Sequence, residues 1–436
     1  MGSKWIEVSL GEISEKIGDG IHGTPVYNDS GNYYFINGSN LSDNSIKITD
    51  TTKRVDHDEF LKHRKELGDN TILVSINGTI GNTALYNNEN IILGKSACYI
   101  NLKDSISKYF ILYILSGYLF QEYIQRCSTG STIKNVSLKM MRDFRFLMPE
   151  SKEDQEKAVH IIKKVDERKR LSNAQNETLE QMSQTLFKSW FVDFDPVIDN
   201  ALDAGNPIPE ALQSRAELRQ KVRNSADFKP LPADIRALFP AEFEETELGW
   251  VPKGWVTNRL ENILELAYGK ALKKTERING NYPVYGSGGK DGTHNEYLVK
   301  GPGIIVGRKG TVGSLHWENK DFYPIDTVFF VKPKEYYSLV YCYQLLKTLG
   351  LENMNTDAAV PGLNRNNAYR LEVVTPTQSI ITKFTNIIQT IQHKMDSNHN
   401  ETENLTALRD TLLPKLISGE LSLEDLPDLV NQTEPA

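Results

Sequence analysis

The stretch Phe384-Thr-Asn-Ile-Ile-Gln-Thr-Ile-Gln-His-Lys-Met395 repeats large apolar side chains at alternating spacings of four and three residues. Leu405, Leu408 and Leu412 continue the same phase further along the chain. Heptad spacing over several turns is typical of a long helix that packs against another helix as a coiled coil. The alternative is a helix that buries the same stripe within one ordinary core.

An equivalent stripe lies 226 residues earlier in the chain. Ser172 and Asn176 interrupt the first stripe. Asn398 and Thr402 interrupt the second stripe at the same two positions. Two helices with matched stripes and a matched polar interruption predict one antiparallel pair, whose register the polar residues fix. The residues expected to pack between the helices are Ile162, Val165, Leu179, Met182, Leu186, Phe384, Ile388, Ile391, Leu405, Leu408 and Leu412.

The segments that precede the two helices also repeat. Trp5-Ile-Glu-Val-Ser-Leu-Gly-Glu-Ile13 returns as Trp255-Val-Thr-Asn-Arg-Leu-Glu-Asn-Ile263. Asn77-Gly-Thr-Ile-Gly81 returns as Lys309-Gly-Thr-Val-Gly313. The offset between matching residues falls from 250 at the first match to 226 along the helices. Insertions and deletions are therefore confined to the parts before the helices, as expected for two similar domains that carry different ligand surfaces.

Short β-rich runs next to helical periodicity predict that each repeat contains a mixed α/β domain. The expected strands are Ile72–Ile76, Ala97–Ile100, Ile304–Val306 and Phe329–Val331, and the expected helices are Lys108–Arg126 and Tyr336–Leu349. The predicted fold class is mixed α+β, with two pseudo-repeated domains joined by two long antiparallel coiled-coil helices. The predicted segments are a first domain at 1–150, a helix at 151–192, a linker with a short helix near Glu210–Arg223 at 193–247, a second domain at 248–376, a helix at 377–425 and an acidic tail at 426–436.

Composition restricts the class of protein. The chain has 436 residues, 39% of them hydrophobic, which is enough for more than one core. Three cysteines without metal-ligand or disulfide spacing point to a reducing, cytoplasmic setting. The longest apolar stretch, Tyr109–Phe120, is too short to cross a bilayer, which excludes a membrane protein. A net charge of −7 argues against a general polyanion binder, so DNA binding would need a locally basic surface.

The sequence contains no recognisable catalytic set. Phe194-Asp-Pro-Val197 lacks the second proline and the aromatic residue of an amino-methyltransferase loop. Gly286-Ser-Gly-Gly-Lys290 is only loosely similar to a phosphate loop, because Asp291 replaces the hydroxyl residue after the lysine. The eight histidines are scattered, without metal-ligand spacing. We therefore expect no catalytic residue, no metal site and no cofactor in this chain.

Candidate binding residues lie in turns that combine glycine with hydroxyl, amide or basic side chains. Glycine lets the backbone approach a phosphate, Lys supplies a point charge, and Arg or Asn can bind a base edge through two hydrogen bonds. The alternative is that these are solvated surface turns, and that the Gly-Thr-x-Gly turns shared by both halves only form the fold. The candidate DNA-contacting residues are His22, Thr24, Lys53, Arg54, Arg64, Asn77 and Thr79 in the first half, and Lys270, Lys273, Lys274, Tyr285, Ser287, Lys290, Arg308, Lys309 and Thr311 in the second.

Three further segments carry a family resemblance that extends over nearly the whole chain. They are Leu186-Phe-Lys-Ser-Trp-Phe-Val-Asp-Phe194, Leu248-Gly-Trp-Val-Pro-Lys-Gly-Trp255 and Leu412-Leu-Pro-Lys-Leu-Ile-Ser-Gly-Glu-Leu421. With the duplicated layout, they make the chain similar to the specificity (S) subunits of type I restriction–modification systems.

The resemblance implies two target recognition domains, each reading one half of a split site in double-stranded DNA, with the helices acting as a ruler between them. It also implies that two methylation (M) subunits dock on the helices and that restriction (R) subunits join the complex. S-adenosylmethionine, ATP and Mg are then expected on the partner subunits. Two alternatives stay open at this point: a self-contained DNA modification enzyme with unrecognised motifs, and a coiled-coil adaptor without DNA selectivity.

Overall fold

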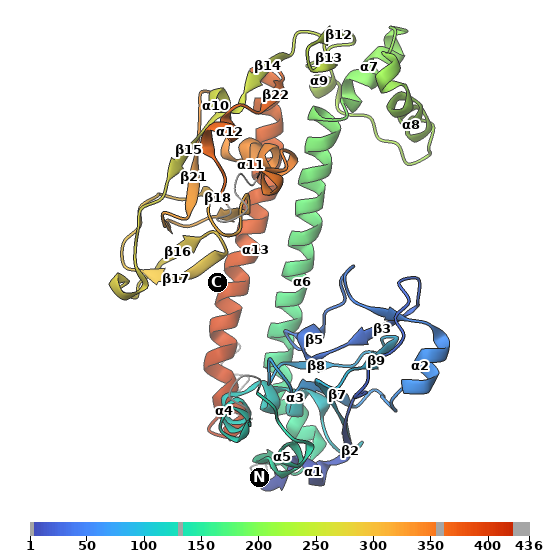
Figure 1. Cartoon of the computed structure of the whole chain (residues 1–436), viewed down its shortest axis with the longest axis vertical. Coiled ribbons are helices and arrows are strands. Elements are labelled where there is room, and N and C mark those ends of the chain that lie inside the picture. Colours follow the sequence, from blue (N-terminus) through green and yellow to red (C-terminus); the bar gives the residue numbers. More distant parts are fainter. Residues whose placement is uncertain (1–3, 130–133, 355–361, 422–436) are drawn as a thin grey trace. The chain divides into compact units, whose positions relative to one another are not determined.

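The computed structural model describes residues 4–129, 134–354 and 362–421, which form two compact units. The first unit is made by Met1–Leu171 with Glu401–Ala436, and the second by Ser172–Asn400. Two long helices, α6 (Lys152–Phe191) and α13 (Gln378–Ser418), each contribute one half to each unit (Figure 1). Each unit also contains one mixed α/β domain. The predicted acidic tail at 426–436 lies outside the described residues.

The first domain is built around a four-stranded sheet with the order β2-β10-β7-β8. Strand β1 pairs antiparallel with β11 at the base of the domain, and β3 pairs parallel with β9. The elements are β1 (Trp5–Ser9), α1 (Leu10–Ile13), β2 (Ser14–Asp19), β3 (Tyr33–Ile36), β4 (Leu41–Ser42), β5 (Ser45–Ile46), β6 (Arg54–Val55), α2 (His57–His63), β7 (Thr71–Ser75), β8 (Thr83–Leu85), β9 (Ile91–Leu93), β10 (Ala97–Leu102), α3 (Lys108–Ser116), α4 (Tyr118–Cys127), α5 (Leu138–Asp143) and β11 (Arg145–Pro149).

The second domain has the same topology, which confirms the duplication predicted from the sequence. Its four-stranded sheet has the order β15-β21-β18-β19, β14 pairs antiparallel with β22, and β16 pairs parallel with β20. The elements are β14 (Val256–Arg259), α10 (Leu260–Ile263), β15 (Leu264–Tyr268), β16 (Tyr282–Gly286), β17 (Gly289–His294), β18 (Gly303–Gly307), β19 (Leu315–Glu318), β20 (Tyr323–Pro324), β21 (Val328–Pro333), α11 (Leu339–Thr348), α12 (Arg365–Tyr369) and β22 (Glu372–Thr375).

Each domain shares a hydrophobic core with the helix halves of its own unit. In the first unit, Ile162 of α6 and Leu416 of α13 belong to the same buried cluster as β7 and α3. The side chain of Gln155 in α6 is fully buried and satisfied on both sides. It accepts a hydrogen bond from the Ser107 backbone N–H and donates one to the Pro149 carbonyl, at 2.9 Å each. The start of α6 is thereby tied to the first domain.

One predicted helix is divided in two. The helix expected over Lys108–Arg126 is instead α3 followed by α4, with Gly117 between them in an extended conformation. A Cβ at this position would come within 3.0 Å of the Tyr113 carbonyl oxygen. Glycine therefore permits a close turn that a larger residue would crowd. In the part of the chain that is described, no helix is both long and apolar enough to cross a membrane.

The two long helices run antiparallel (Figure 1). In the first unit, Arg168 Nε and Nη2 donate to the two carboxylate oxygens of Glu401 at 2.7 and 3.1 Å. In the second unit, Asn398 Nδ2 donates to Asn176 Oδ1 at 2.9 Å, and Asn176 Nδ2 donates to the Met395 carbonyl at 3.2 Å. Asn398 is only 1% exposed. The prediction that matched polar residues meet inside the helix pair is therefore confirmed for Asn176 and Asn398.

The apolar residues expected between the helices are buried or half-buried, with one exception. Ile162, Val165, Phe384 and Ile388 are buried, and Leu179, Leu186, Ile391, Leu405, Leu408 and Leu412 are half-buried. The prediction for Met182 is wrong, because its side chain is 53% exposed and its neighbour Ser183 is buried instead. A helix with 3.6 residues per turn drifts away from a strict seven-residue repeat, so the buried face moves by about one position along α6.

The segment between α6 and β14 is folded, whereas a linker with one short helix was expected. It contains α7 (Asp195–Ala204), α8 (Gln213–Arg223), α9 (Ala233–Arg236), β12 (Phe243–Thr246) and β13 (Gly249–Pro252). Helix α8 corresponds to the short helix that was predicted. Helices α7 and α9 were not predicted, and Val197 and Ile235 from them are buried in the core of the second unit.

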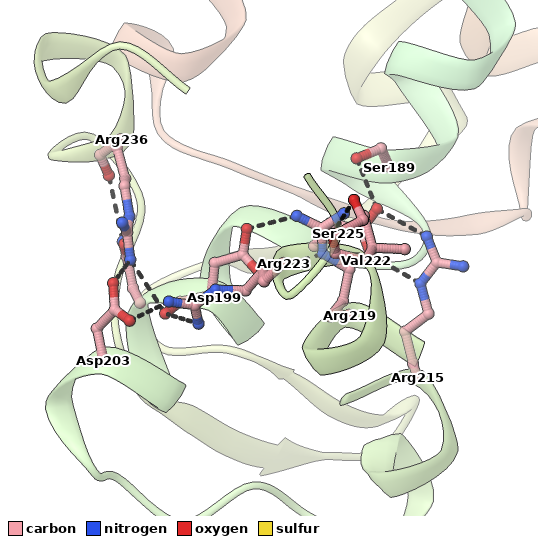
Figure 2. A network of polar contacts seen from close by, with 11 residues as sticks. Ser189, Asp199, Asp203, Arg215, Arg219, Val222, Arg223, Ser225 and Arg236 are labelled. Atoms are coloured by element: carbon pink, nitrogen blue, oxygen red, sulfur yellow. Dashed lines mark hydrogen bonds and ion pairs between the residues drawn. The ribbon is translucent and has the colours of Figure 1, made fainter. Parts of the chain in front are cut away.

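Charged side chains join α7 to α8 (Figure 2). Arg215 donates to both carboxylate oxygens of Asp195 at 2.7 Å, and Arg219 donates to both oxygens of Asp199 at 3.1 and 2.5 Å. Arg223 pairs with Asp203. Each arginine follows its partner by 20 residues, so the two helices lie parallel and in register. We call these pairs the Asp–Arg ladder.

The ladder is the main attachment of α8. All residues of this helix are described, and only Ala216 among them is buried. Asp195 and Asp199 are 4% and 8% exposed, so their carboxylates need hydrogen-bond donors from the protein. The guanidinium groups supply them to both, and the Ser189 hydroxyl donates one more to Asp195 at 2.7 Å. At the more exposed end, hydrogen bonds from Arg223 and Arg236 lower the pKa of Asp203.

We predict that Asn398→Ala destabilises the second unit by about 1–3 kcal/mol, because the half-buried Asn176 amide oxygen then loses its donor. Urea unfolding followed by circular dichroism measures this change. Ser397→Ala, at the exposed neighbouring position, is the matched control, with an expected change below about 0.5 kcal/mol. Equal midpoints for the two variants would contradict the structural importance of the pair.

We also predict that Arg219→Ala loosens α8, because the nearly buried carboxylate of Asp199 loses two hydrogen bonds. A loss of about 2 kcal/mol corresponds to amide hydrogen exchange roughly 30-fold faster in α8. Lys221→Ala changes an exposed cation of the same helix and is the control. Unchanged exchange in the Arg219 variant would show that the ladder does not hold the helix.

Candidate nucleic-acid interface

A cluster of aromatic and guanidinium groups lies at one end of the second domain's sheet. The Arg308 and Arg365 guanidinium carbons lie 4.9 and 4.7 Å from the ring centre of Tyr268. Arg365 also lies 5.7 Å from the ring centre of Tyr369. Tyr268 itself is 48% exposed. We call these four residues the Tyr268 cluster.

Backbone hydrogen bonds bring the members of the cluster together. Tyr268 is the last residue of β15, and Arg308 follows the last residue of β18. The Leu363 N–H donates to the Arg308 carbonyl at 2.8 Å, which places the start of α12 beside the end of β18. Asn364 caps α12 through its side-chain oxygen, so Arg365 begins the helix next to Tyr268.

The two guanidinium groups have few partners within the protein. Arg308 Nη1 donates to the Asp326 backbone carbonyl at 3.0 Å. Arg365 Nε is enclosed and has no hydrogen-bond partner. Within residues 4–129, 134–354 and 362–421, no carboxylate forms an ion pair with either arginine. The cluster thus presents positive charge together with a partly exposed tyrosine.

The first domain carries different residues at the equivalent positions. Tyr268 pairs with Phe329 at the end of β15, and at the same register Asp19 pairs with Cys98 at the end of β2. The Val136 N–H donates to the Ile76 carbonyl as Leu363 does to Arg308. By this correspondence, Asp19, Ile76 and Leu138 occupy the places of Tyr268, Arg308 and Arg365. The carboxylate of Asp19 lies 2.9 Å from His22 Nε2.

The candidate residues of the first domain are at least partly exposed. His22, Thr24, Lys53, Arg64 and Thr79 are exposed, and Arg54 and Asn77 are half-buried. Two of the cations lie over rings, Lys53 at 5.9 Å from the Tyr27 centre and Arg54 at 5.1 Å from the Tyr34 centre. Asn77 lies in a backbone bridge with Asn135.

Most candidates of the second domain are also exposed. Lys270, Lys273, Lys274, Lys290, Lys309 and Thr311 are exposed, and Ser287 and Arg308 are half-buried. Two of the lysines are paired with carboxylates: Lys273 with Glu276 at 3.6 Å and Lys274 with Asp291 at 3.0 Å. The hydrogen bond from Lys274 and a second from Arg277 lower the pKa of Asp291.

Tyr285 is not a surface residue, and its prediction as a DNA contact is wrong. Its side chain is 8% exposed and belongs to a small core with Ile305, Phe322 and Val328. Its hydroxyl donates to the Glu318 carboxylate at 2.9 Å. The Gly-rich turn predicted from Tyr285-Gly-Ser-Gly-Gly begins inside β16, where the side chain at this position points into the core.

The sequence interpretation missed Tyr268 and Arg365. Tyr268 had a weak signal, because an aromatic residue directly precedes the Gly-Lys turn that starts at Gly269. The sequence contains no signal for Arg365, because only the backbone pairing in the structure shows that residues 362–365 lie beside residues 307–309. Among the described residues, no group of three His, Cys, Asp or Glu side chains has the arrangement of a metal site.

Comparison with known proteins agrees with the duplicated fold. The family described as type I restriction modification DNA specificity domain matches residues 2–181 and 252–406. A type I restriction enzyme specificity subunit of Haemophilus influenzae is 26% identical, with 96% of this chain and 100% of the relative aligned. A specificity subunit of Methanocaldococcus jannaschii is 24% identical, over 82% of this chain and 78% of the relative.

A solved structure shows the same fold. The crystal structure of a type I restriction–modification S subunit from M. genitalium superposes with a TM-score of 0.54 at 20% identity, covering 95% of this chain and 96% of that one. The family match includes both domains and the greater part of both long helices, and extends over most of the chain. The protein therefore belongs to the family of type I restriction–modification DNA specificity subunits.

Proposed function

We propose that this chain selects the DNA sequence for a type I restriction–modification complex, with each domain reading one half of a split site. The observation that carries the proposal is the pair of domains with one topology and different chemistry at equivalent strand ends. The second domain has Tyr268 with two arginines there, and the first has Asp19 with His22. A shared scaffold with unlike ends suits two readers of different sequences.

The exposed side chains around both strand ends suit contact with a duplex. Lysines such as Lys270 and Lys309 supply point charges for phosphates, while arginine and asparagine side chains can bind base edges in the major groove. The net charge of −7 is compatible with this arrangement, because the cations are grouped locally and partner subunits supply further contacts to the DNA backbone.

We further propose that two methylation subunits dock on the long helices, and that restriction subunits join this complex. Along α13, a shallow groove is lined by Lys383, Asn386, Ile387, Thr390 and Ile391. The 226-residue repeat places Lys157, His160, Ile161, Lys164 and Val165 at the equivalent positions of α6. Two similar helix faces of mixed apolar and polar character support two similar docking sites.

Catalysis is assigned to the partners in this proposal. S-adenosylmethionine would bind to the methylation subunits, and ATP with Mg would serve the restriction subunits, in the cytoplasm. This assignment is supported by the segment Phe194–Val197. It is the part of the sequence most similar to an amino-methyltransferase loop, but it lacks the second proline and the aromatic residue of that loop.

Mapping methylated bases in a host that carries the whole system tests the function directly. We expect one motif made of two short defined parts separated by a fixed gap, with a methylated adenine in each part. A motif without a gap would overturn the two-reader proposal. Methyl transfer by the isolated chain would instead show a self-contained enzyme, and a partner-bound complex without sequence preference would show an adaptor.

We predict that Arg308→Ala or Lys273→Ala weakens recognition of one half-site only, because both residues belong to the second domain. Leu405→Ala and Val165→Ala, in the helices, should disturb both half-sites. Binding of the complex to duplexes that carry changes in either half measures the difference. A change of preference in both halves after the Arg308 substitution would contradict separate readers.

We predict that four residues inserted at matched positions of α6 and α13 lengthen the gap between the two half-sites. Four helical residues add roughly 6 Å, close to the rise of two base pairs. The insertion must be made in both helices so that their stripes stay in phase. An unchanged gap in the methylated motif would refute the role of the helices as a spacer. The control is the same insertion in one helix alone, which puts the two stripes out of phase.

A further inference from the structure

We infer that Arg365 binds a guanine in the half-site read by the second domain, with Tyr268 and Tyr369 holding its guanidinium group in place. This inference rests on the proposed function. It adds to it one residue that reads the DNA and the base that this residue binds. It concerns a position that differs between the two domains and was not a candidate in the sequence.

The rings around Arg365 cover part of the side chain without using its strongest donors. The guanidinium carbon lies 4.7 Å from the Tyr268 ring centre and 5.7 Å from the Tyr369 ring centre. Contact between a guanidinium face and an aromatic ring leaves the N–H groups in the guanidinium plane free to donate. The rings thus restrict the orientation of the side chain before any ligand arrives, which lowers the entropy lost on binding.

Within the described part of the chain, the positive charge at this site has no carboxylate partner. Among the described residues, no carboxylate pairs with Arg365, and its Nε is enclosed without a hydrogen-bond partner. Arg308 shares the Tyr268 ring but is tied to the Asp326 carbonyl. A planar fork of donors beside a second cation favours a ligand with two acceptors and negative surroundings.

Among the bases of a duplex, guanine is the one that matches this fork. In the major groove it presents two neighbouring acceptors, O6 and N7, which receive two parallel N–H donors from one arginine. Adenine presents N7 as an acceptor but an amino donor beside it, which faces the second N–H of the fork. Thymine and cytosine do not offer two adjacent acceptors on this edge.

A purely structural role does not account for the cluster. The first domain forms the same sheet with Asp19, Ile76 and Leu138 at the three equivalent positions. The fold therefore does not need this set of side chains. Tyr268 is also 48% exposed, which leaves part of its surface available to a ligand.

The test uses the complete complex of this chain with its methylation subunits, and duplexes that carry its mapped motif. Each guanine of the motif is replaced in turn by 7-deazaguanine, which removes the N7 acceptor and keeps base pairing. For the unmodified complex, we expect one guanine in one half-site at which this replacement lowers affinity roughly 10- to 150-fold, the range for loss of one hydrogen bond to a charged group.

The Arg365→Ala complex should bind the normal and modified duplexes equally well. Arg365→Lys keeps the charge without the fork, so we expect it to retain general DNA affinity and to show a smaller sensitivity to the modified guanine than the unmodified complex does. Lys309→Ala is the matched control at the adjacent edge: it should weaken binding to all duplexes alike and keep the sensitivity. Thermal unfolding of each complex checks that the second unit stays folded.

The inference is overturned if the Arg365→Ala complex keeps the sensitivity to 7-deazaguanine, or if no guanine of either half-site shows it. Either result leaves the proposed function standing, provided that the unmodified complex still prefers its split motif. A complex that binds all duplexes with equal affinity would instead overturn both.

Discussion

The hydrogen bonds between Asn176 and Asn398 are the constraint on which the helix pair depends. Each amide in this buried place has a partner, and a shift of either helix by one turn would separate them. Apolar stripes alone tolerate such a shift, because leucine and isoleucine pack at neighbouring positions with little loss. One polar pair therefore selects one register, and the positions of the residues that follow on both helices are determined by it.

The two domains are attached to the long helices by different polar contacts. Gln155 joins the start of α6 to the first domain through two buried hydrogen bonds. In the second unit, Lys347 of α11 pairs with the half-buried Glu180 of α6, and the indole of Trp317 donates to Asp396 of α13 at 3.1 Å. Both domains are thus bound to the long helices by polar contacts inside the apolar surface, while Tyr268 and Asp19 at the strand ends stay exposed and half-buried, respectively.

The periodic parts of the structure could be predicted from the sequence, and the local exceptions could not. The duplication, the long helices and the meeting of Asn176 with Asn398 follow from spacing alone. The break at Gly117 depends on a close backbone contact that periodicity does not contain. Met182 is exposed because a helix with 3.6 residues per turn drifts away from the seven-residue repeat that was assumed. The site was harder to predict, because a turn-like run such as Tyr285–Lys290 looks accessible until the sheet buries its first residue. Arg365 meets Tyr268 only through strand pairing between distant segments.

The two units differ in how the end of a long helix meets the first strand of the domain. In the first unit, Gly419, just after α13, lies against the indole of Trp5, where an added Cβ would be 3.0 Å from the ring. That junction is non-covalent, whereas in the second unit residues 192–255 connect α6 to β14 through the chain itself. The contact between Gly419 and Trp5 is therefore held by side-chain packing alone, at a place where the second unit has a folded connection between α6 and β14.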